Sequence, residues 1–585
     1  MNRRTPAMRY APLFALVAVQ VLIIALAPSK APGTSPVGGF GPGAAAGVGE
    51  VGAEVPIDPA TGQPITGGGA AGGAGASGGA AGPAGAKQAL NAAGIPVTGD
   101  TSHCVGGLQF DPAIFAFAPK CVPKFVGKNP GRTYRGVTDK KIKVLIYNGN
   151  FGTGIEEVLT AQGFAASVPQ QQEMADASEK LINSKFELYG RELEIKAVGG
   201  ACSAAPPDNK CLRAEFEGLV QREQPFAVVW GTSVSSESYD HLSDLKVVNM
   251  GGWFFRDSFS TERRPYHWDI QMSGSQIARH AAEWYCNRMH GGIARYSGEQ
   301  DDMRAKPRTM GVITSDDPEN VEMIKEFKGH LSRCGASVAP GKEYYYAQNL
   351  QTVEQQRDEL VQKMKTPPEA TTVLCFCELV APIFLYSEAE QQQWWPEHII
   401  VGTGFMDADQ SAQTYDHFLP PAAGSAAPND EPAKDEQFEN AFGLAQADEQ
   451  GSLADSFSGR AYKAYKADAT GPPYDSAEVD FQYFMMLASM AQFAGPNLTP
   501  ETLEQGAFRL GVIDPGGKKD PKLSQRSFKP GDYTWVDNLR EVYWSTEKTS
   551  AFNGEKGRYI TLNGGRWFSL GEYPKGQIEL PAKPR

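Results

Sequence analysis

The chain has 585 residues and a formal net charge of −13 at pH 7. This length exceeds what one hydrophobic core supports, so we expect two or more lobes once non-globular segments are set aside. The acidic balance, without a cluster of Lys and Arg, argues against a nucleic-acid partner and against binding to an anionic membrane surface, because both select basic clusters.

The N-terminus has the pattern of an export signal. Three arginines within the first nine residues precede an apolar run from Ala11 to Ala27. This length suits either a cleaved signal peptide or an uncleaved membrane anchor. Because Pro28 and Pro32 follow the small residues at which cleavage would occur, we favour an anchor over residues 1–32 with an exported body. A cleaved signal peptide is the alternative.

A Gly/Ala-rich stretch follows, and we assign residues 33–100 to a disordered linker. Most of it consists of Gly, Ala, Pro, Val and Ser, which bury too little apolar surface to offset the chain entropy lost on folding. Such a tether has a typical reach on the order of 40 Å. It would hold a folded body away from a membrane.

Eight cysteines in an exported chain favour disulfides over metal ligands. Proximity in the sequence suggests these pairs: Cys104 with Cys121, Cys202 with Cys211, and Cys286 with Cys334. The first pair would staple an entry segment over residues 101–140. Cys375 and Cys377 would share one face of a strand, where a direct bond strains the backbone, so two buried thiols are favoured. No histidine spacing near a cysteine indicates a metal site.

Three apolar segments between Lys141 and Trp253 share one pattern: KIKVLIYNGNFG, RELEIKAVGG and PFAVVWGTSVSSES. Each ends in Gly, Ser, Thr or Asn, and helix-like stretches separate them. This spacing is typical of a parallel βαβ sheet, in which a neighbouring strand is reached by a long crossover. Ligands of such open sheets bind beyond the carboxyl ends of the strands, where these polar residues lie.

The order of segments from Lys141 to Trp567 resembles the type I periplasmic binding proteins, in particular the leucine/isoleucine/valine-binding branch that serves ABC importers. Later segments that carry the match are RTMGVITSDDPENVEMIKEFKGHLSRCGASV, HIIVGTGFMDADQ and DSAEVDFQYFMMLASMAQFAG. No single motif is specific, but the ordered set is. The resemblance implies an α/β fold of two Rossmann-like lobes with parallel sheets, joined by a three-crossing hinge that closes on a ligand.

The resemblance assigns residues 141–268 and 413–510 to lobe one, and residues 269–412 and 511–578 to lobe two. Loops at the strand ends would face the cleft between the lobes. The candidate ligand contacts on these loops are Asn150, Phe151, Thr232, Ser233, Ser235, Ser236, Gly252, Trp253 and Phe254 in lobe one, and Asp316, Glu378 and Asp407 in lobe two.

The loop GTSVSS opens a predicted helix, so its hydroxyls and backbone N–H groups could bind a carboxylate. In amino-acid binders of the family the same loop holds the ligand's α-carboxylate. The alternative is that Ser235 or Ser236 only caps the helix. In lobe two, Asp316, its neighbour Asp317, Glu378 and Asp407 are candidates for binding a ligand cation, and each could instead be solvated.

The segment MGGWFF departs from the family pattern. Amino-acid binders usually have a small residue and a hydroxyl after this strand, whereas here Gly252 precedes Trp253 and Phe254. A ring at this place suits stacking on an aromatic or hydrophobic ligand, or packing within its own lobe. Pro318 and Glu319 replace the usual tyrosine of lobe two. Both changes argue against a plain branched-chain amino acid.

The sequence shows no GxSxG elbow after a predicted strand, no HExxH, no P-loop and no dinucleotide glycine pattern after the first strand, so we expect no enzyme activity and no cofactor. We predict an exported, membrane-tethered monomer that captures a small organic ligand, either amino-acid- or amide-like or aromatic and hydrophobic. It would deliver this ligand to the permease of an ABC importer. The alternatives are a cell-surface ligand sensor and, with least support, an enzyme.

Overall fold

The computed structural model describes residues 88–152, 165–204, 206–231, 235–298, 301–347, 350–379, 381–417, 437–515 and 522–581. The predicted signal or anchor, and the predicted linker as far as residue 87, lie outside the described residues. Residues 88–585 belong to one compact unit, and everything below concerns that unit.

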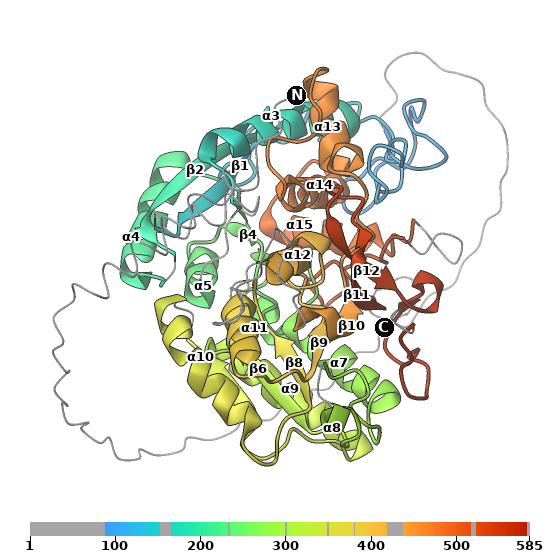
Figure 1. Cartoon of the computed structure of the whole chain (residues 1–585). Helices are drawn as coiled ribbons and strands as arrows, with labels where there is room; N and C mark the ends of the chain where they lie inside the picture. The colour runs from blue at the N-terminus through green and yellow to red at the C-terminus, as the bar shows by residue number, and fades with distance from the viewer. Residues whose placement is uncertain are drawn as a thin grey trace, which may run out of the picture. The chain divides into compact units, whose positions relative to one another are not determined.

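Lobe one is built on a parallel sheet with the strand order β2-β1-β3-β4-β5. Its strands are β1 (Lys141–Asn150), β2 (Glu192–Ser203), β3 (Ala227–Trp230), β4 (Val248–Met250) and β5 (His267–Trp268). The connecting helices are α3 (Val168–Lys185), α4 (Asn209–Glu223), α5 (Ser236–Asp244) and α6 (Asp257–Glu262) (Figure 1). The predicted βαβ order over this region is confirmed.

Both faces of this sheet are buried, because successive side chains of a strand point to opposite faces. On β1, Val144 and Ile146 pack in the core shared with α3, whereas Leu145 and Tyr147 pack in the core shared with α4 and α5. The near-continuous apolar run that predicted a strand at this point therefore reflects burial on two sides.

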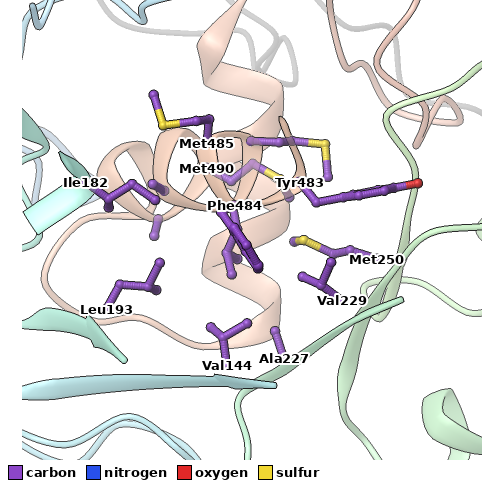
Figure 2. Close-up of a cluster of buried hydrophobic side chains, with 14 of the residues drawn as sticks. Val144, Ile182, Leu193, Ala227, Val229, Met250, Tyr483, Phe484, Met485 and Met490 are labelled. Carbon is purple, nitrogen blue, oxygen red and sulfur yellow. The ribbon is translucent and has the colours of Figure 1, made fainter. Parts of the chain in front are cut away.

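Three later helices complete lobe one: α13 (Phe457–Tyr465), α14 (Ala477–Ala494) and α15 (Pro500–Leu510). α14 is apolar around most of its circumference, as expected for a helix enclosed on all sides. Figure 2 shows Phe484, Met485 and Met490 of α14 in one cluster with Val144 of β1 and Val229 of β3. The chain thus returns to lobe one after visiting the second sheet.

Lobe two has an eight-stranded sheet with the order β12-β11-β10-β9-β8-β6-β7, and β13 pairs with β11. Its strands are β6 (Met310–Ser315), β7 (Glu343–Tyr346), β8 (Thr372–Phe376), β9 (Glu397–Val401), β10 (Ala441–Ala445), β11 (Leu539–Thr549), β12 (Lys556–Thr561) and β13 (Trp567–Phe568). β6 to β10 are parallel, and β11 and β12 add an antiparallel edge.

In the described part of the chain, six α-helices accompany this sheet. They are α7 (Gly274–Arg288), α8 (Asp301–Arg304), α9 (Pro318–Leu331), α10 (Leu350–Lys365), α11 (Ala381–Gln391) and α12 (Asp409–His417). Short 3₁₀ turns are η1 (Ser332–Cys334), η2 (Phe438–Asn440) and η4 (Asn563–Gly565) in lobe two, and η3 (Leu453–Asp455) before α13.

The boundary predicted at residue 413 is wrong by about thirty residues. β10 pairs with β9 in parallel and with β11 in antiparallel register, so the chain stays in the second sheet until Ala445. α12 likewise packs on β12 of lobe two. β10 is short and lies within an acidic, Pro/Ala-rich stretch, residues 420–450, whose composition is typical of a surface insertion and so conceals the strand.

Three crossings join the lobes, as predicted: residues 269–273, 446–456 and 511–538, the last with residues 516–521 outside the described part. The first and third run side by side, since Asp269 N–H donates to Tyr533 O at 3.1 Å and Trp535 N–H donates to Asp269 O at 3.0 Å. The side chain of Gln446 accepts a hydrogen bond of 2.8 Å from Met272 N–H, which joins the first crossing to the second.

Further hydrogen bonds link the second crossing to the third. Asp448 in the second crossing accepts from Ser524 N–H at 2.6 Å and from the Arg526 guanidinium at 2.7 Å, both in the third crossing. All three crossings are therefore linked pairwise by hydrogen bonds, and they form one hinge and not three separate linkers.

The entry segment before β1 packs on lobe one, and its ordered part begins earlier than predicted. Residues 88–100, assigned to the disordered linker, form a turn in which the Asn91 side chain accepts from the N–H groups of Ala93 and Ile95, both at 3.0 Å. Ile95 is buried. The Gln88 amide donates to Thr98 O and Lys124 O. Side-chain capping of the turn overrides a composition that suggests disorder.

The three predicted disulfides are present. Their Cα–Cα distances are 5.8 Å for Cys104–Cys121, 5.6 Å for Cys202–Cys211 and 5.8 Å for Cys286–Cys334. The expectation of free thiols at Cys375 and Cys377 is wrong, because the structure pairs these residues. Cys377 lies one residue past β8, where the chain is no longer extended, and the Cα–Cα distance is 5.1 Å. In an extended strand it would be roughly 6.6 Å.

Among the described residues, no helix is both long enough and apolar enough to span a bilayer. The apolar run from Ala11 to Ala27, predicted as a signal or anchor, lies outside them.

Candidate functional site: the seam between the lobes

The N-terminus of α5 faces the N-terminus of α9 across the seam between the lobes. Ser236, the first residue of α5, donates from its hydroxyl to the Asp317 carboxylate at 3.1 Å, and the backbone N–H of Ser236 interacts with the same carboxylate. Asp317 also caps its own helix, because it accepts from Glu319 N–H at 2.9 Å. One carboxylate therefore binds the starts of two helices from different lobes.

Asp317 is only 7% exposed. Burial raises its pKa above the ordinary value of an aspartate, while the hydrogen bonds from Glu319 and Ser236 act in the opposite direction. Ser235, the preceding residue of the loop, bonds within lobe one, through its hydroxyl to the Asn209 side chain at 2.7 Å. Of the predicted contacts in this loop, Thr232 and Ser233 lie outside the described residues.

An ion pair joins the lobes next to this contact. The Arg256 guanidinium, at the start of α6, donates to both oxygens of Glu319 on α9 at 3.1 and 3.2 Å. The Arg256 side chain is 23% exposed and that of Glu319 is 15% exposed. Bidentate geometry with partial burial distinguishes this pair from ordinary surface ion pairs.

Aromatic rings from both lobes meet at the loop after β4. The rings of Trp253 in lobe one and Phe405 in lobe two have centroids 5.6 Å apart at an angle of 41°. Trp253 packs against the core on the α4 and α5 side of lobe one, and Phe405 against the core of lobe two. The buried indole N–H of Trp253 has no hydrogen-bond partner among the described residues. This pair is where a ring of a ligand would find apolar partners from both lobes.

Phe254 was predicted as a ligand contact, but the structure uses it for packing. It is 1% exposed and lies in the core of lobe two with Met323 and Ile277, although its own chain segment belongs to lobe one. Gly274 permits this insertion, because a Cβ there would lie 2.3 Å from Phe254 O. The ring of Phe254 therefore has no surface to offer a ligand in this arrangement.

Asp407 was also predicted as a ligand contact, and it instead binds the hinge. Its Oδ2 accepts from Gln446 N–H at 2.6 Å and from Ala447 N–H at 3.2 Å in the second crossing. The residue is 3% exposed, and burial raises its pKa. Its Oδ1 has no hydrogen-bond partner among the described residues.

The remaining predicted contacts lie at strand ends in separate surroundings. Glu378 accepts from Ala381 N–H at 2.8 Å and so caps α11, whereas Asp316 is exposed. Asn150 ties the end of β1 to β2 through Ala201 O, and its oxygen accepts from Gly152 N–H. Phe151 is half-buried against lobe one. Gly252 is buried, and a Cβ there would lie 2.5 Å from the Asp269 carboxylate.

A small cavity lies within lobe two. It has a volume of about 10 Å³, room for roughly one water molecule. Tyr346 of β7, Cys377, Arg357 of α10 and Phe384 of α11 are among its lining residues. At the seam, side chains of the two lobes contact each other directly, as the Ser236–Asp317, Arg256–Glu319 and Trp253–Phe405 pairs show.

The sequence did not single out Arg256, Glu319, Phe405 or Gln446 as site residues. The charges of Arg256 and Glu319 are ordinary for a surface helix, and only the topology brings α6 and α9 together. Phe405 had a usable signal, since it directly follows Gly404 in a glycine-containing loop after an apolar strand.

Comparison with known proteins finds matches of structure only. No protein-family model matches the sequence, and no curated protein matches it. The fatty acid ABC transporter substrate-binding protein from Thermomonospora curvata matches with a TM-score of 0.50 at 13% identity, over 77% of this chain and 99% of that chain.

Two further solved structures match less well. A substrate-binding protein of an ABC transporter from Aeropyrum pernix has a TM-score of 0.49 at 12% identity, over 74% of this chain and 97% of that chain. A possible leucine/isoleucine/valine-binding protein from Rhodopirellula baltica has a TM-score of 0.48 at 11% identity, over 72% of this chain and 96% of that chain.

The match to the Thermomonospora curvata protein spans nearly all of that chain and includes both lobes of this one. Together with two α/β lobes, parallel strands and three crossings, it identifies the architecture. The chain has the type I periplasmic binding fold, the fold of the ABC transporter substrate-binding proteins that it resembles.

Proposed function

We propose that this protein is an exported solute-binding protein that captures a small organic ligand between its lobes and delivers it to the permease of an ABC importer. The observation that carries the proposal is the meeting of two α/β lobes, joined by three crossings, along their strand ends. Ligands of open parallel sheets bind at such ends. We further propose that the protein acts as a monomer, tethered to the membrane through its N-terminal segment.

The aromatic pair supports an apolar or aromatic ligand. Trp253 and Phe405 come from different lobes, so a flat or apolar ligand group placed between them would gain contacts from both. The free indole N–H of Trp253 supplies one donor for an acceptor atom of that ligand. Binding energy from both lobes favours the closed state over the open state, which is the requirement for ligand-driven closure.

The seam is closed by the protein's own contacts, and this sets a condition for binding. Ser236 binds Asp317, and Arg256 binds Glu319, without any ligand. A ligand must therefore separate the rings of Trp253 and Phe405. Its own contacts with the two lobes must then contribute more binding free energy than the interlobe contacts that it replaces.

The first test is a ligand screen by thermal shift on the purified full-length protein. The panel contains amino acids, their amides, aromatic acids, aromatic amides, and saturated fatty acids of several lengths. A ligand that binds only the native state at about 100 times its Kd raises the free energy of unfolding by about 2.7 kcal/mol. A shift with one class establishes solute capture and names that class. If no class shifts the transition, solute capture is contradicted and a cell-surface sensor that binds another protein becomes the better hypothesis.

A further inference from the structure

Among the described residues, lobe one provides no side-chain cap for the start of helix α5. Ser235 occupies the N-cap position, but its side chain makes no capping bond and donates to Asn209 instead. The first N–H groups of a helix have no partner within the helix, and they carry partial positive charge. A carboxylate is the group that such a helix start binds best.

Asp317 of lobe two supplies that carboxylate. Its Oδ2 accepts from the Ser236 hydroxyl at 3.1 Å, and Ser236 N–H contributes a second interaction. Its Oδ1 accepts from Glu319 N–H at 2.9 Å. Both oxygens are thus in use, one for each lobe, and the side chain is largely buried.

The surrounding charges leave little to attract a second carboxylate. Arg256, the cation that joins the lobes beside this contact, is bound by Glu319 and lies 3.7 Å from Glu326. Asp316, next to Asp317, adds a negative charge at the surface. A ligand carboxylate placed at the start of α5 would meet Asp317 at close range, and like charges at such a distance repel.

We propose that Asp317 acts as a built-in carboxylate ligand of α5 and thereby determines the specificity of the seam, which accepts ligands that are neutral or cationic at this end and rejects those that bring a carboxylate. The consequence for ligands rests on the proposed function. The contact between Asp317 and α5 does not, so the two can fail separately.

The decisive variant is Asp317→Ser in the full-length protein. Serine retains the cap of α9, since it is a good N-cap residue, but it removes the carboxylate that reaches α5. The vacated place should then bind a small carboxylate from solution. We expect sodium acetate to raise the Tm of Asp317→Ser by about 2 °C more than sodium chloride of the same ionic strength. We expect no difference between the two salts for the wild type.

Asp316→Ser is the matched control, because it removes the neighbouring carboxylate, which is exposed. It should respond to acetate as the wild type does. If Asp317→Ser does not fold by itself, its refolding yield is measured in acetate and in chloride, with the same expectation. An acetate effect of equal size in the wild type and both variants, or no acetate effect in Asp317→Ser, would overturn the proposal.

Matched probes then test specificity. Benzoate and benzamide have the same ring and differ in charge, so their relative binding reports on the start of α5. We expect Asp317→Ser to gain at least tenfold in affinity for benzoate relative to benzamide, compared with the wild type. An unchanged ratio would overturn the specificity claim. If acetate stabilises Asp317→Ser while no ligand of the screen binds the wild type, the built-in carboxylate stands and the proposed function fails.

Discussion

The hydroxyl of Tyr483 on α14 donates a hydrogen bond of 2.6 Å to the carboxylate of Asp269 in the first crossing. In Figure 2 the ring of Tyr483 extends away from the methionines of α14, with its hydroxyl at the far end. The helix that fills the core of lobe one is thereby tied to the hinge. Burial raises the pKa of Asp269 to about 6, and the bond from Tyr483 acts against this increase.

Tyr483→Phe should destabilise the protein in a pH-dependent way. The hydroxyl stabilises the charged form of Asp269, which predominates above about pH 6. Loss of one hydrogen bond to a buried group costs about 1–2 kcal/mol, and we expect the larger cost at pH 8 and a smaller one at pH 5. Urea unfolding of the full-length protein at both pH values measures this. Tyr465→Phe, at a ring that is 38% exposed, is the control. An equal cost at both pH values would show that Tyr483 acts by packing alone.

Asp480→Asn should change how stability depends on pH. Asp480 is buried on α14, accepts a hydrogen bond from Tyr474, and has a pKa raised by burial to about 7. Because this folded-state pKa lies above the unfolded value, the wild type binds a proton more tightly when folded. The stabilisation of the folded state that results from this raised pKa is fully present below about pH 4 and is lost as the pH rises to about 7.

Relative to Asp480→Asn, the free energy of unfolding of the wild type should fall through this window by at most about 1.4 kcal/mol per pH unit. Urea unfolding between pH 4 and pH 8 tests it. Parallel curves for the two proteins would mean that Asp480 does not titrate in this range.

The ion pair between Arg256 and Glu319 should couple the lobes. A double-mutant cycle with Arg256→Ala and Glu319→Ala should give an interaction energy of about 1 kcal/mol in urea unfolding, since both side chains are partly buried. The matched control is Arg213 and Glu237, within lobe one, whose side chains are 44% and 47% exposed. That pair should give a value near zero. Equal coupling in the two cycles would assign no special role to the pair across the seam.

Truncation of Trp253 and of its neighbour Phe254 to alanine should have different effects on stability and on ligand affinity. Phe254→Ala removes a ring from the core of lobe two and should cost about 3–5 kcal/mol of stability. Trp253→Ala should cost less and should weaken binding of an apolar or aromatic ligand found in the screen at least tenfold. Urea unfolding and calorimetric titration separate the two effects. An unchanged affinity would assign Trp253 to packing.

The sequence predicted the two-lobe fold well because its main signals are local. Apolar runs that end in small polar residues mark β1, β2 and β3, and the spacing of cysteines marks three disulfides. The errors arose where tertiary contacts decide the outcome. β10 belongs to lobe two because it pairs with β9 and with β11. Residues 88–100 adopt an ordered turn because the Asn91 side chain caps it and because the segment packs on lobe one.

The site was harder to predict than the fold. The rule that ligands bind at strand ends selected Ser236 and Trp253, which lie at the seam and whose contact with a ligand stays a prediction. The same rule selected Phe254 and Asp407, which serve packing and the hinge. The partner of a site residue can lie far away in the sequence. Asp269 of the hinge and Tyr483 of α14, for example, are 214 residues apart. The spacing of residues within one segment does not predict which distant residue will contact it.

The entry segment has a mechanical consequence. Cys104 and Cys121 close a loop whose Phe115 and Phe117 pack against Phe457, Phe481 and Trp535. The first two of these partners belong to lobe one, and Trp535 belongs to the third crossing and to the same core. A pull along the chain from residue 87 would therefore act first on this disulfide-closed segment and, through the packing of its phenylalanines, on lobe one. Under the proposed tethering through the N-terminal segment, lobe one would be the fixed frame, and closure on a ligand would move lobe two.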